Sequence, residues 1–577
     1  MTRLWNDPAD FVDEMIDGFV AANDRYVRRV TGGVVRSTVT RPGEVAIVIG
    51  GGSGHYPAFG GLVGPGLAHG AVMGNLFASP SAQQVHAVAT AAHEGGGVLL
   101  TYGNYAGDVL NFDAAQERLR ADGIPCETVV VTDDIFSAPA SEPERRRGIA
   151  GDLVVFRVAS AAAQAGYDLG EVARVARHAN DRTRSIGVAF DGCTLPGAAA
   201  PLFTVPEGRM AIGLGIHGEP GIDEVDVPSA DDLADLLVAR LLEEAPSHAR
   251  RVVPILNGLG SVKYEEMFVV YRRVAELLTA ADLKVLDPHV GEYCTSFDMA
   301  GTSLTLFWLD DELEHLWQTA VDTPAYRRGS VAPAAAAPVV DASPVAVVAF
   351  APADDSSRVA AATVVTALDA TLGVIMAHVD ELGRLDAVAG DGDHGIGMQR
   401  GARAAVEAAT MARDAGAGAE STLAAAGDAW SDRAGGTSGV LWGLLLAAVA
   451  SALGDAGSPS SMSIASGVAA GLDAVTAHGK ARAGDKTLVD ALEPFSTTLT
   501  RRLAEGDDLA AAWRTAAEAA SEAAAATADL LPQLGRARSH GKKSLGTPDP
   551  GAHSLALVVG AVANVLGDHG ADEGERR

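Results

Sequence analysis

The stretch Glu44-Val-Ala-Ile-Val-Ile-Gly-Gly-Gly-Ser-Gly-His55 places a run of apolar, mostly β-branched residues directly before a glycine-rich turn. A short apolar run of this kind predicts a buried strand. Consecutive glycines at its carboxyl end let a ligand approach the backbone, and open α/β sheets bind small molecules at that edge. The stretch predicts an α/β fold whose first loop either binds a polar ligand or forms a plain tight turn.

Strand and helix patterns alternate through the first 330 residues. This alternation predicts an α/β region with mostly parallel sheets, and a second lobe is expected to begin near residues 185–200. Besides residues 44–49, the predicted strands are 98–102, 128–131, 185–190 and 251–256, and the predicted helices are 81–94, 108–121, 149–166 and 263–279.

A Pro/Ala-rich spacer at residues 331–352 separates this region from the rest of the chain. Spacers of this composition are extended and semi-rigid. Downstream of it, Ala-rich segments carry apolar residues at helical spacing, and only four aromatic residues occur. We therefore predict an α/β domain at 1–330 and an all-helical domain at 353–577.

Composition limits the classes of partner. A chain of 577 residues needs more than one core, and its net charge of -30 argues against nucleic acid or an anionic membrane surface as partners. The three cysteines, Cys126, Cys193 and Cys294, are too widely spaced for a disulfide framework or a Cys-x-x-Cys metal site. The longest apolar candidate for a membrane span, residues 439–453, is short and Ala-rich. We expect a cytoplasmic protein.

Three polar residues in the α/β region stand where chemistry is expected. His55 closes the glycine-rich turn. Asp108, at the start of a predicted helix, is either an N-cap or a general base. His217, between residues 213–216 and Gly218, is either a turn residue or a nucleophile that adds to a carbonyl.

Two motifs in the helical region point to phosphate chemistry. Asp386, Asp391 and Asp393 lie within eight residues and supply the hard oxygen ligands that Mg²⁺ prefers, although an acidic surface turn has the same composition. The string Arg433-Ala-Gly-Gly-Thr-Ser-Gly439 precedes a long apolar helix, where free amides bind phosphate or a hydroxyl simply caps the helix. Together the two motifs indicate phosphoryl transfer.

These motifs resemble the dihydroxyacetone kinase family in its fused, single-chain, ATP-dependent form. The resemblance implies a ketose-binding domain followed by an eight-helix barrel that binds ATP. It also implies a homodimer with domain exchange, in which transfer crosses between chains, while transfer within one chain stays open. The motifs that carry it are Gly50 to Pro57, Gly74 to Ser81, Asn104 to Phe112, Gly213 to Gly221, Gly390 to Gly395, Gly435 to Gly439, Gly484 to Thr487 and Asp549 to Ala552.

The resemblance assigns roles around the ketose. His217 matches the histidine that binds the substrate carbonyl as a hemiaminal, which excludes ligands without a carbonyl such as glycerol. Asp108 matches the proposed general base, and His55 lies beside it. The substrate-binding positions implied by the family are Gly52, Ser53, Ser79, Gly103 and Asn104.

The resemblance also assigns the nucleotide site. Asp386, Asp391 and Asp393 match the ligands of two Mg²⁺ ions that bridge the ATP phosphates. The further nucleotide-binding positions are His394, Gly436, Thr437, Ser438, Asp485, Arg536, Asp549 and Gly551.

Departures from the family pattern bear on the substrate. Gly103 stands where dihydroxyacetone-specific members usually carry Lys, and this predicts a wider pocket. Asp152 and Phe156 stand where the family commonly has Thr and a basic or imidazole side chain, and residues 538–548 replace a shorter pattern. We predict phosphorylation of a terminal hydroxyl of erythrulose, with the D-enantiomer favoured, and dihydroxyacetone is the alternative substrate.

Three other classes remain as alternatives. A non-catalytic ketose sensor should have a degraded aspartate triplet, and this triplet is complete. A phosphoenolpyruvate-linked phosphotransferase usually has its two domains on separate chains. A lyase that cyclises flavin adenine dinucleotide would need the metal site but not His217.

Overall fold

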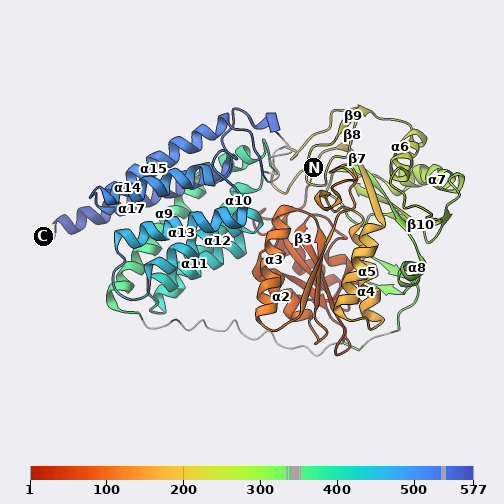
Figure 1. Cartoon of the computed structure of the whole chain (residues 1–577), viewed down its shortest axis with the longest axis horizontal. Helices are drawn as coiled ribbons and strands as arrows, with labels where there is room; N and C mark the ends of the chain where they lie inside the picture. Colours follow the sequence, from red (N-terminus) through yellow and green to blue (C-terminus); the bar gives the residue numbers. More distant parts are fainter. Residues whose placement is uncertain are drawn as a thin grey trace. The chain divides into compact units, whose positions relative to one another are not determined.

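The computed structural model describes residues 2–198, 200–332, 335–336, 350, 353–390, 392–534 and 541–575 (Figure 1). The chain forms two compact units, Met1–Ala342 and Ser343–Arg577. Asp391, Arg536 and most of the predicted 331–352 spacer lie outside the described residues, and the predicted domain limits stay predictions.

The first lobe contains a six-stranded sheet in the order β1-β2-β4-β3-β5-β6. Four neighbouring strands, β4, β3, β5 and the edge strand β6, run parallel, whereas β2 pairs antiparallel with β4 and β1 pairs antiparallel with β2. The strands are β1 (Val27–Val30), β2 (Gly33–Arg36), β3 (Ala46–Ser53), β4 (Gly70–Leu76), β5 (Val98–Gly103) and β6 (Cys126–Val131).

Helices cover both faces of this sheet. Figure 1 shows α2 and α3 on one side of β3, with α4 and α5 on the other. Val48 of β3 faces the core formed with α2 and α3, whereas its neighbour Ile47 faces the core formed with α4 and α5. Burial on both faces explains the uninterrupted apolar run of β3. The helices of this lobe are α1 (Phe11–Ala22), α2 (Ala82–Ala92), α3 (Ala106–Ala121), α4 (Asp152–Gln164) and α5 (Leu169–Asp181).

The second lobe differs from the predicted parallel arrangement. Its sheet runs β11-β10-β13-β7-β8-β9, and every pair from β10 to β9 is antiparallel; only β11 and β12 run parallel to β10. Strands β10 and β13 are buried along nearly their whole length, so their continuous apolar sequences look like those of parallel strands. Periodicity alone therefore could not give the strand direction.

The remaining elements of this unit are β7 (Thr183–Asp191), β8 (Arg209–Ile212), β9 (Asp223–Asp226), α6 (Ala230–Leu242), β10 (Arg251–Gly260), α7 (Tyr264–Ala280), β11 (Lys284–Val285), β12 (His289–Gly291), β13 (Ala300–Trp308), α8 (Asp311–Trp317), β14 (Val321–Asp322) and β15 (Arg327–Arg328).

The second unit is helical, and its described part contains eight α-helices. Each helix contacts the next one along the chain, and the last contacts the first, so the eight close into a ring around one apolar core. This arrangement confirms the predicted eight-helix barrel. The helices are α9 (Asp355–Asp386), α10 (His394–Asp414), α11 (Ala419–Ala434), α12 (Gly436–Leu453), α13 (Ser461–Gly479), α14 (Val489–Ala504), α15 (Leu509–Ala526) and α17 (Pro550–Glu575).

Three of these helices are long and apolar enough to cross a membrane when judged by length and composition alone: Asp355–Asp386, Gly436–Leu453 and Pro550–Gly567. From the sequence, only residues 439–453, which lie in the second of these helices, were named as a candidate span. In the barrel, all three contribute side chains to the shared apolar core, and 28 to 33% of each apolar stretch is buried there.

Candidate active site

A small cavity of about 20 Å³ lies at the carboxyl ends of β3 and β5, where the second lobe meets the first. The parallel strands bring their following loops to this edge, and the loop between β8 and β9 reaches it from the other sheet. Of the predicted site residues, the structure brings five to the cavity wall: Gly52, His55, Gly103, Asp108 and His217.

The two predicted histidines contact each other. His55 Nε2 lies 2.9 Å from His217 Nε2. His55 Nδ1 lies 2.8 Å from the Thr295 carbonyl oxygen, and His217 Nδ1 lies 3.1 Å from Glu219 Oε1. Residues that are 162 positions apart in sequence therefore form one hydrogen-bonded chain.

The groups that contact His55 and His217 indicate which of their ring nitrogens carry hydrogen. A carbonyl oxygen only accepts, so Nδ1 of His55 carries hydrogen. Glu219 also receives the His217 backbone N–H and lies 3.7 Å from Arg147 Nη1, which favours its ionised form and places hydrogen on Nδ1 of His217. One further proton must then lie between the two Nε2 atoms. The pair shares a proton at the point where a ligand carbonyl would be attacked.

His217 is better covered than its glycine-flanked sequence indicates. The residue is only 8% exposed. Its ring packs edge-on against His55, Phe77 and Tyr105, with ring centres between 4.7 and 5.2 Å apart. Residues from three separate loops hold the imidazole in one orientation, which favours a positioned nucleophile over a free turn residue.

Asp108 does not cap its helix. The N-cap of α3 is Tyr105, and Asp108 lies three positions further on, in the first turn. The side chain is nearly buried and lies on the cavity wall with the two histidines. Of the two alternatives for this residue, the geometry favours the general base.

Two glycines bring backbone up to the cavity. A Cβ at Gly52 would lie 2.8 Å from the Ala78 backbone nitrogen, so the loop after β4 closes tightly on the carboxyl end of β3. A Cβ at Gly103 would lie 3.2 Å from the Gly148 carbonyl oxygen and 3.3 Å from the Tyr105 ring. A side chain at position 103 would therefore press on the Gly148 segment and the Tyr105 ring, and the wider pocket stays a prediction.

The other predicted ketose-site residues have partners away from the cavity wall. Ser53 Oγ donates to the Gly74 carbonyl oxygen at 2.7 Å, and Ser79 Oγ donates to the Pro80 carbonyl oxygen at 3.2 Å. Asn104 Nδ2 donates to the carbonyl oxygens of Glu144 and Arg146, which ties the 144–146 segment to the end of β5. Their binding roles stay predictions.

Several wall residues were not singled out from sequence as site residues. Phe59 and Tyr105 supply apolar surface, and burial raises the pKa of the wall thiol Cys294 well above its usual value, which keeps it neutral. Asp152, noted only as a departure from the family, also lies on the wall. Glu219 could have been found, because it follows His217 by two residues and a histidine nucleophile needs an orienting acceptor.

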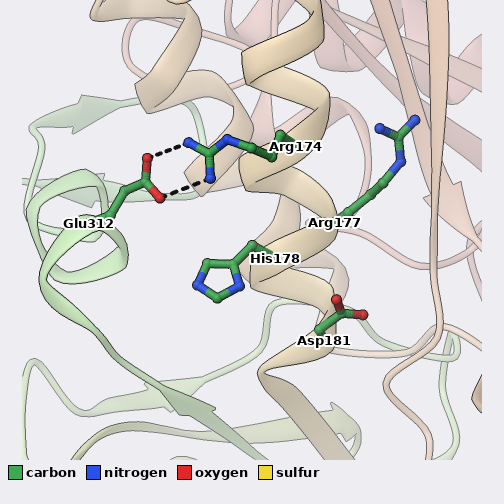
Figure 2. Close-up of a pocket in the computed structure, with 5 residues that line it drawn as sticks. All are labelled: Arg174, Arg177, His178, Asp181 and Glu312. Carbon is green, nitrogen blue, oxygen red and sulfur yellow. Dashed lines mark hydrogen bonds and ion pairs between the residues drawn. The ribbon is translucent and has the colours of Figure 1, made fainter.

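A second depression of the first unit has no catalytic arrangement. Figure 2 shows it between α5 and α8, with Arg174 pointing at Glu312 and held there by two hydrogen bonds. His178 lies 2.6 Å from Asp310, again on the surface. These are exposed ion pairs, which contribute little and are typical of a solvated face.

In the helical unit, one histidine joins three helix N-termini. His394 is the first residue of α10; its Nδ1 faces Ser438 Oγ of α12 at 3.3 Å, and its Nε2 faces Ser554 Oγ of α17 at 3.0 Å. Ser554 Oγ also donates to the Gly551 carbonyl oxygen. Three N-termini point free amides and positive dipole ends at one place, which is a favourable environment for phosphate groups.

Carboxylates surround this same point. Asp386 ends α9, and its Oδ2 accepts the backbone N–H of His394 at 3.3 Å. Burial and the charge of Asp386 raise the pKa of Asp393 to about 7, and burial together with Asp490 and Asp386 raises the pKa of Asp549 to about 7. Carboxyl groups that disfavour each other's ionisation at neutral pH form a site that a divalent cation would stabilise.

The donor chemistry therefore fits Mg²⁺, with Asp386 and Asp393 as hard oxygen ligands and Asp549 nearby. No cluster of three or more His, Cys, Asp or Glu side chains suited to a metal occurs within the part of the chain that the structure describes, and Asp391 is not in that part. The three-aspartate ligand set and the number of ions stay predictions.

The other predicted nucleotide residues lie in two loops. Gly436 and Thr437 open α12, where Gly435 and Gly436 both have positive φ and a Cβ on Gly436 would meet open space. Asp485 accepts the backbone N–H of Arg482 at 2.8 Å and so shapes its own loop. In that loop Lys486 Nζ donates to the Ser544 carbonyl oxygen, so Lys486 links its loop to the segment that contains Ser544.

Comparison with known proteins covers nearly the whole chain. The Dak1 domain model matches residues 17–325, and the DAK2 domain model matches residues 388–564. An L-erythrulose kinase of Pectobacterium atrosepticum is 58% identical over 98% of this chain and 97% of its own length. A D-erythrulose kinase of Mycolicibacterium smegmatis is 54% identical over 98% of this chain and 99% of its own length.

A solved structure agrees with these matches. The dihydroxyacetone kinase of C. freundii in complex with AMP-PNP and Mg²⁺ is 31% identical, covers 98% of this chain and 99% of its own, and superimposes with a TM-score of 0.52. The histidine pair, the carboxylate-rich helix junction and these full-length matches lead to one conclusion: the chain belongs to the dihydroxyacetone kinase family, in its fused single-chain form.

Proposed function

We propose that this protein is an ATP-dependent kinase that phosphorylates a terminal hydroxyl of erythrulose. The observation that carries the proposal is the His55–His217 contact beside Asp108 in one cavity, because it combines a nucleophile for a carbonyl with a base for a hydroxyl. The erythrulose kinases at 54% and 58% identity support the four-carbon substrate.

The first step is addition of the ketose to His217. The Nε2 lone pair forms a bond to C2 of the ketose while the carbonyl π bond breaks, and the oxygen takes the proton shared with His55. Nδ1 of His217 can then pass its proton toward Glu219, so the adduct becomes a neutral hemiaminal. Glycerol has no carbonyl and cannot be held in this way.

The second step is phosphoryl transfer. The hydroxyl oxygen attacks the γ-phosphorus of ATP, Asp108 takes the hydroxyl proton, and ADP leaves. In the helical unit, the amides at the starts of α10, α12 and α17 would orient the phosphates, and Asp386 and Asp393 would hold the cation. When bound, Mg²⁺ would neutralise the charge that develops on the phosphate oxygens.

A substrate panel tests the choice of ketose. We expect kcat/KM for erythrulose to exceed that for dihydroxyacetone by about tenfold or more, the discrimination that one extra carbon and hydroxyl can supply. The two related kinases are named for opposite enantiomers, so both enantiomers belong in the panel, with the D-form proposed as preferred. Phosphorylation of glycerol, or a clear preference for dihydroxyacetone, would contradict the proposal.

We further propose that the active protein is a homodimer with domain exchange. The test mixes two inactive variants, His217→Ala and Asp386→Asn, through co-expression. Transfer between chains restores one working site in each mixed dimer, so about a quarter of wild-type activity is expected from random pairing. If transfer occurs within one chain, the mixture stays inactive.

We also propose a cytoplasmic location. Cys126, Cys193 and Cys294 are all free and buried, which suits a reducing compartment. Recovery of the protein from cell lysate without detergent is expected. Its retention in the membrane fraction would instead favour a membrane role for the apolar helices α9, α12 and α17.

A further inference from the structure

A buried acid on the cavity wall has no place in the two steps above. Asp152 opens α4, lies on the wall with the histidine pair, and is only 3% exposed. Its Oδ1 atom is buried and has no hydrogen-bond partner among the residues that the structure describes. A buried polar atom left without a partner costs stability, so its retention requires an explanation.

The neighbouring acid, Asp133, accepts two backbone amides of the segment that leads into α4. Asp133 Oδ1 accepts the backbone N–H of Ile149 at 2.8 Å, and its Oδ2 accepts that of Gly151 at 2.8 Å. Burial, with the charges of Asp133 and Asp108, raises the pKa of Asp152 well above its usual value. The Asp152 carboxyl therefore lies on the wall as a buried group whose Oδ1 atom can take part in a hydrogen bond with a ligand.

The imidazole, carboxyl and hydroxyl groups elsewhere on the wall already have a hydrogen-bond partner or a role in the proposed mechanism. His55 and His217 share a proton, and Asp108 serves the reacting hydroxyl in the proposed mechanism. The Tyr105 hydroxyl donates to the Gly148 carbonyl oxygen at 3.0 Å. Among the carboxyl and imidazole groups on the wall, Asp152 is the one that the mechanism leaves to meet a further hydroxyl of a ligand.

The backbone beside Asp152 is formed by two glycines, Gly103 and Gly148. A Cβ at Gly148 would lie 2.5 Å from Gly103 Cα and 3.0 Å from Asp152 Oδ1. Because both positions are glycine, the two backbone segments close against each other, and no side chain stands between them and the carboxyl. The wall here is shaped by Gly103, Gly148 and Asp152 together.

We propose that Asp152 determines specificity for a four-carbon ketose by forming a hydrogen bond with the hydroxyl that erythrulose has and dihydroxyacetone lacks. This inference rests on the proposed function. A three-carbon ketose leaves the Asp152 carboxyl without a partner, and a site built around such a group discriminates against the ligand that cannot satisfy it.

The test compares Asp152→Ala and Asp152→Asn with the wild type, using kcat/KM for erythrulose and for dihydroxyacetone. Alanine removes the hydrogen bond and should lower the erythrulose-to-dihydroxyacetone ratio by about 10- to 100-fold. Asparagine keeps a donor and an acceptor of similar shape, so its ratio should stay within about fivefold of wild type. Dihydroxyacetone turnover reports whether each variant is folded.

Asp231→Ala is the matched control, because Asp231 also lies in the first turn of a helix, α6, but is exposed and outside the cavity. Its ratio should not change. An equal loss with both ketoses in both Asp152 variants, or an unchanged ratio in Asp152→Ala, would overturn the inference while leaving erythrulose kinase activity intact. A wild type that does not use erythrulose would instead refute the proposed function, and this inference with it.

Discussion

Replacing His217 with alanine is expected to lower kcat/KM for erythrulose by about 10³-fold or more, the size of loss seen when a catalytic nucleophile is removed. His217 Nε2 is the atom that forms the bond to the ketose, and no other imidazole on the cavity wall has the Glu219 partner that orients it. Steady-state kinetics with erythrulose and saturating Mg·ATP measures the loss. ATP binding by calorimetry should be unchanged, because the nucleotide residues lie in the helical unit.

His178→Ala provides a control for this variant. His178 also faces a carboxylate, Asp310 at 2.6 Å, but on the surface and away from the cavity (Figure 2 shows its position on α5). Its activity should match the wild type. If His217→Ala retained a tenth or more of wild-type activity, covalent attachment through this residue would not be required, and the role assigned to the histidine pair would be wrong.

Replacing Asp386 with asparagine is expected to lower kcat by at least about 10²-fold, because a charged ligand of the cation is replaced by a neutral one at the centre of charge development. Asp386 also raises the pKa of Asp393 and receives the His394 amide, so it lies at the meeting point of the carboxylates and the helix starts. The Mg²⁺ concentration for half-maximal activity should rise, and a titration of activity against Mg²⁺ measures this.

Asp369→Asn is the matched control for Asp386→Asn. Asp369 lies on the same helix, α9, but is exposed. Neither its kcat nor its Mg²⁺ requirement should change. An Asp386→Asn variant with normal Mg²⁺ dependence would show that the cation is held elsewhere.

Much of the fold follows from local sequence. The strands after which His55 and Asp108 stand, and the four predicted helices of the first unit, occur within a few residues of their expected limits. Apolar periodicity and glycine-rich turns are local patterns, so they indicate these elements without knowledge of the tertiary structure. The direction of β13 beside β10 is not local, because strands buried on both faces have the same composition in either orientation.

For the site, too, the sequence predicts single residues, whereas their contacts depend on the tertiary structure. The sequence singled out His55 and His217 separately, but only the fold brings their Nε2 atoms to 2.9 Å. Gly103 and Asp152 were both noted from sequence as departures from the family pattern, but only the fold places them on one cavity wall together with Gly148. Their shared position depends on contacts between distant parts of the sequence.

The most direct test of the account is carbon NMR of the protein with erythrulose labelled with ¹³C at C2, in the absence of ATP. We expect the C2 resonance of the bound ketose to move from the carbonyl region to that of a tetrahedral carbon bonded to oxygen and nitrogen, and His217→Ala to abolish the new signal. A bound ketose whose C2 resonance stays in the carbonyl region, at saturation of the wild-type protein, would contradict it.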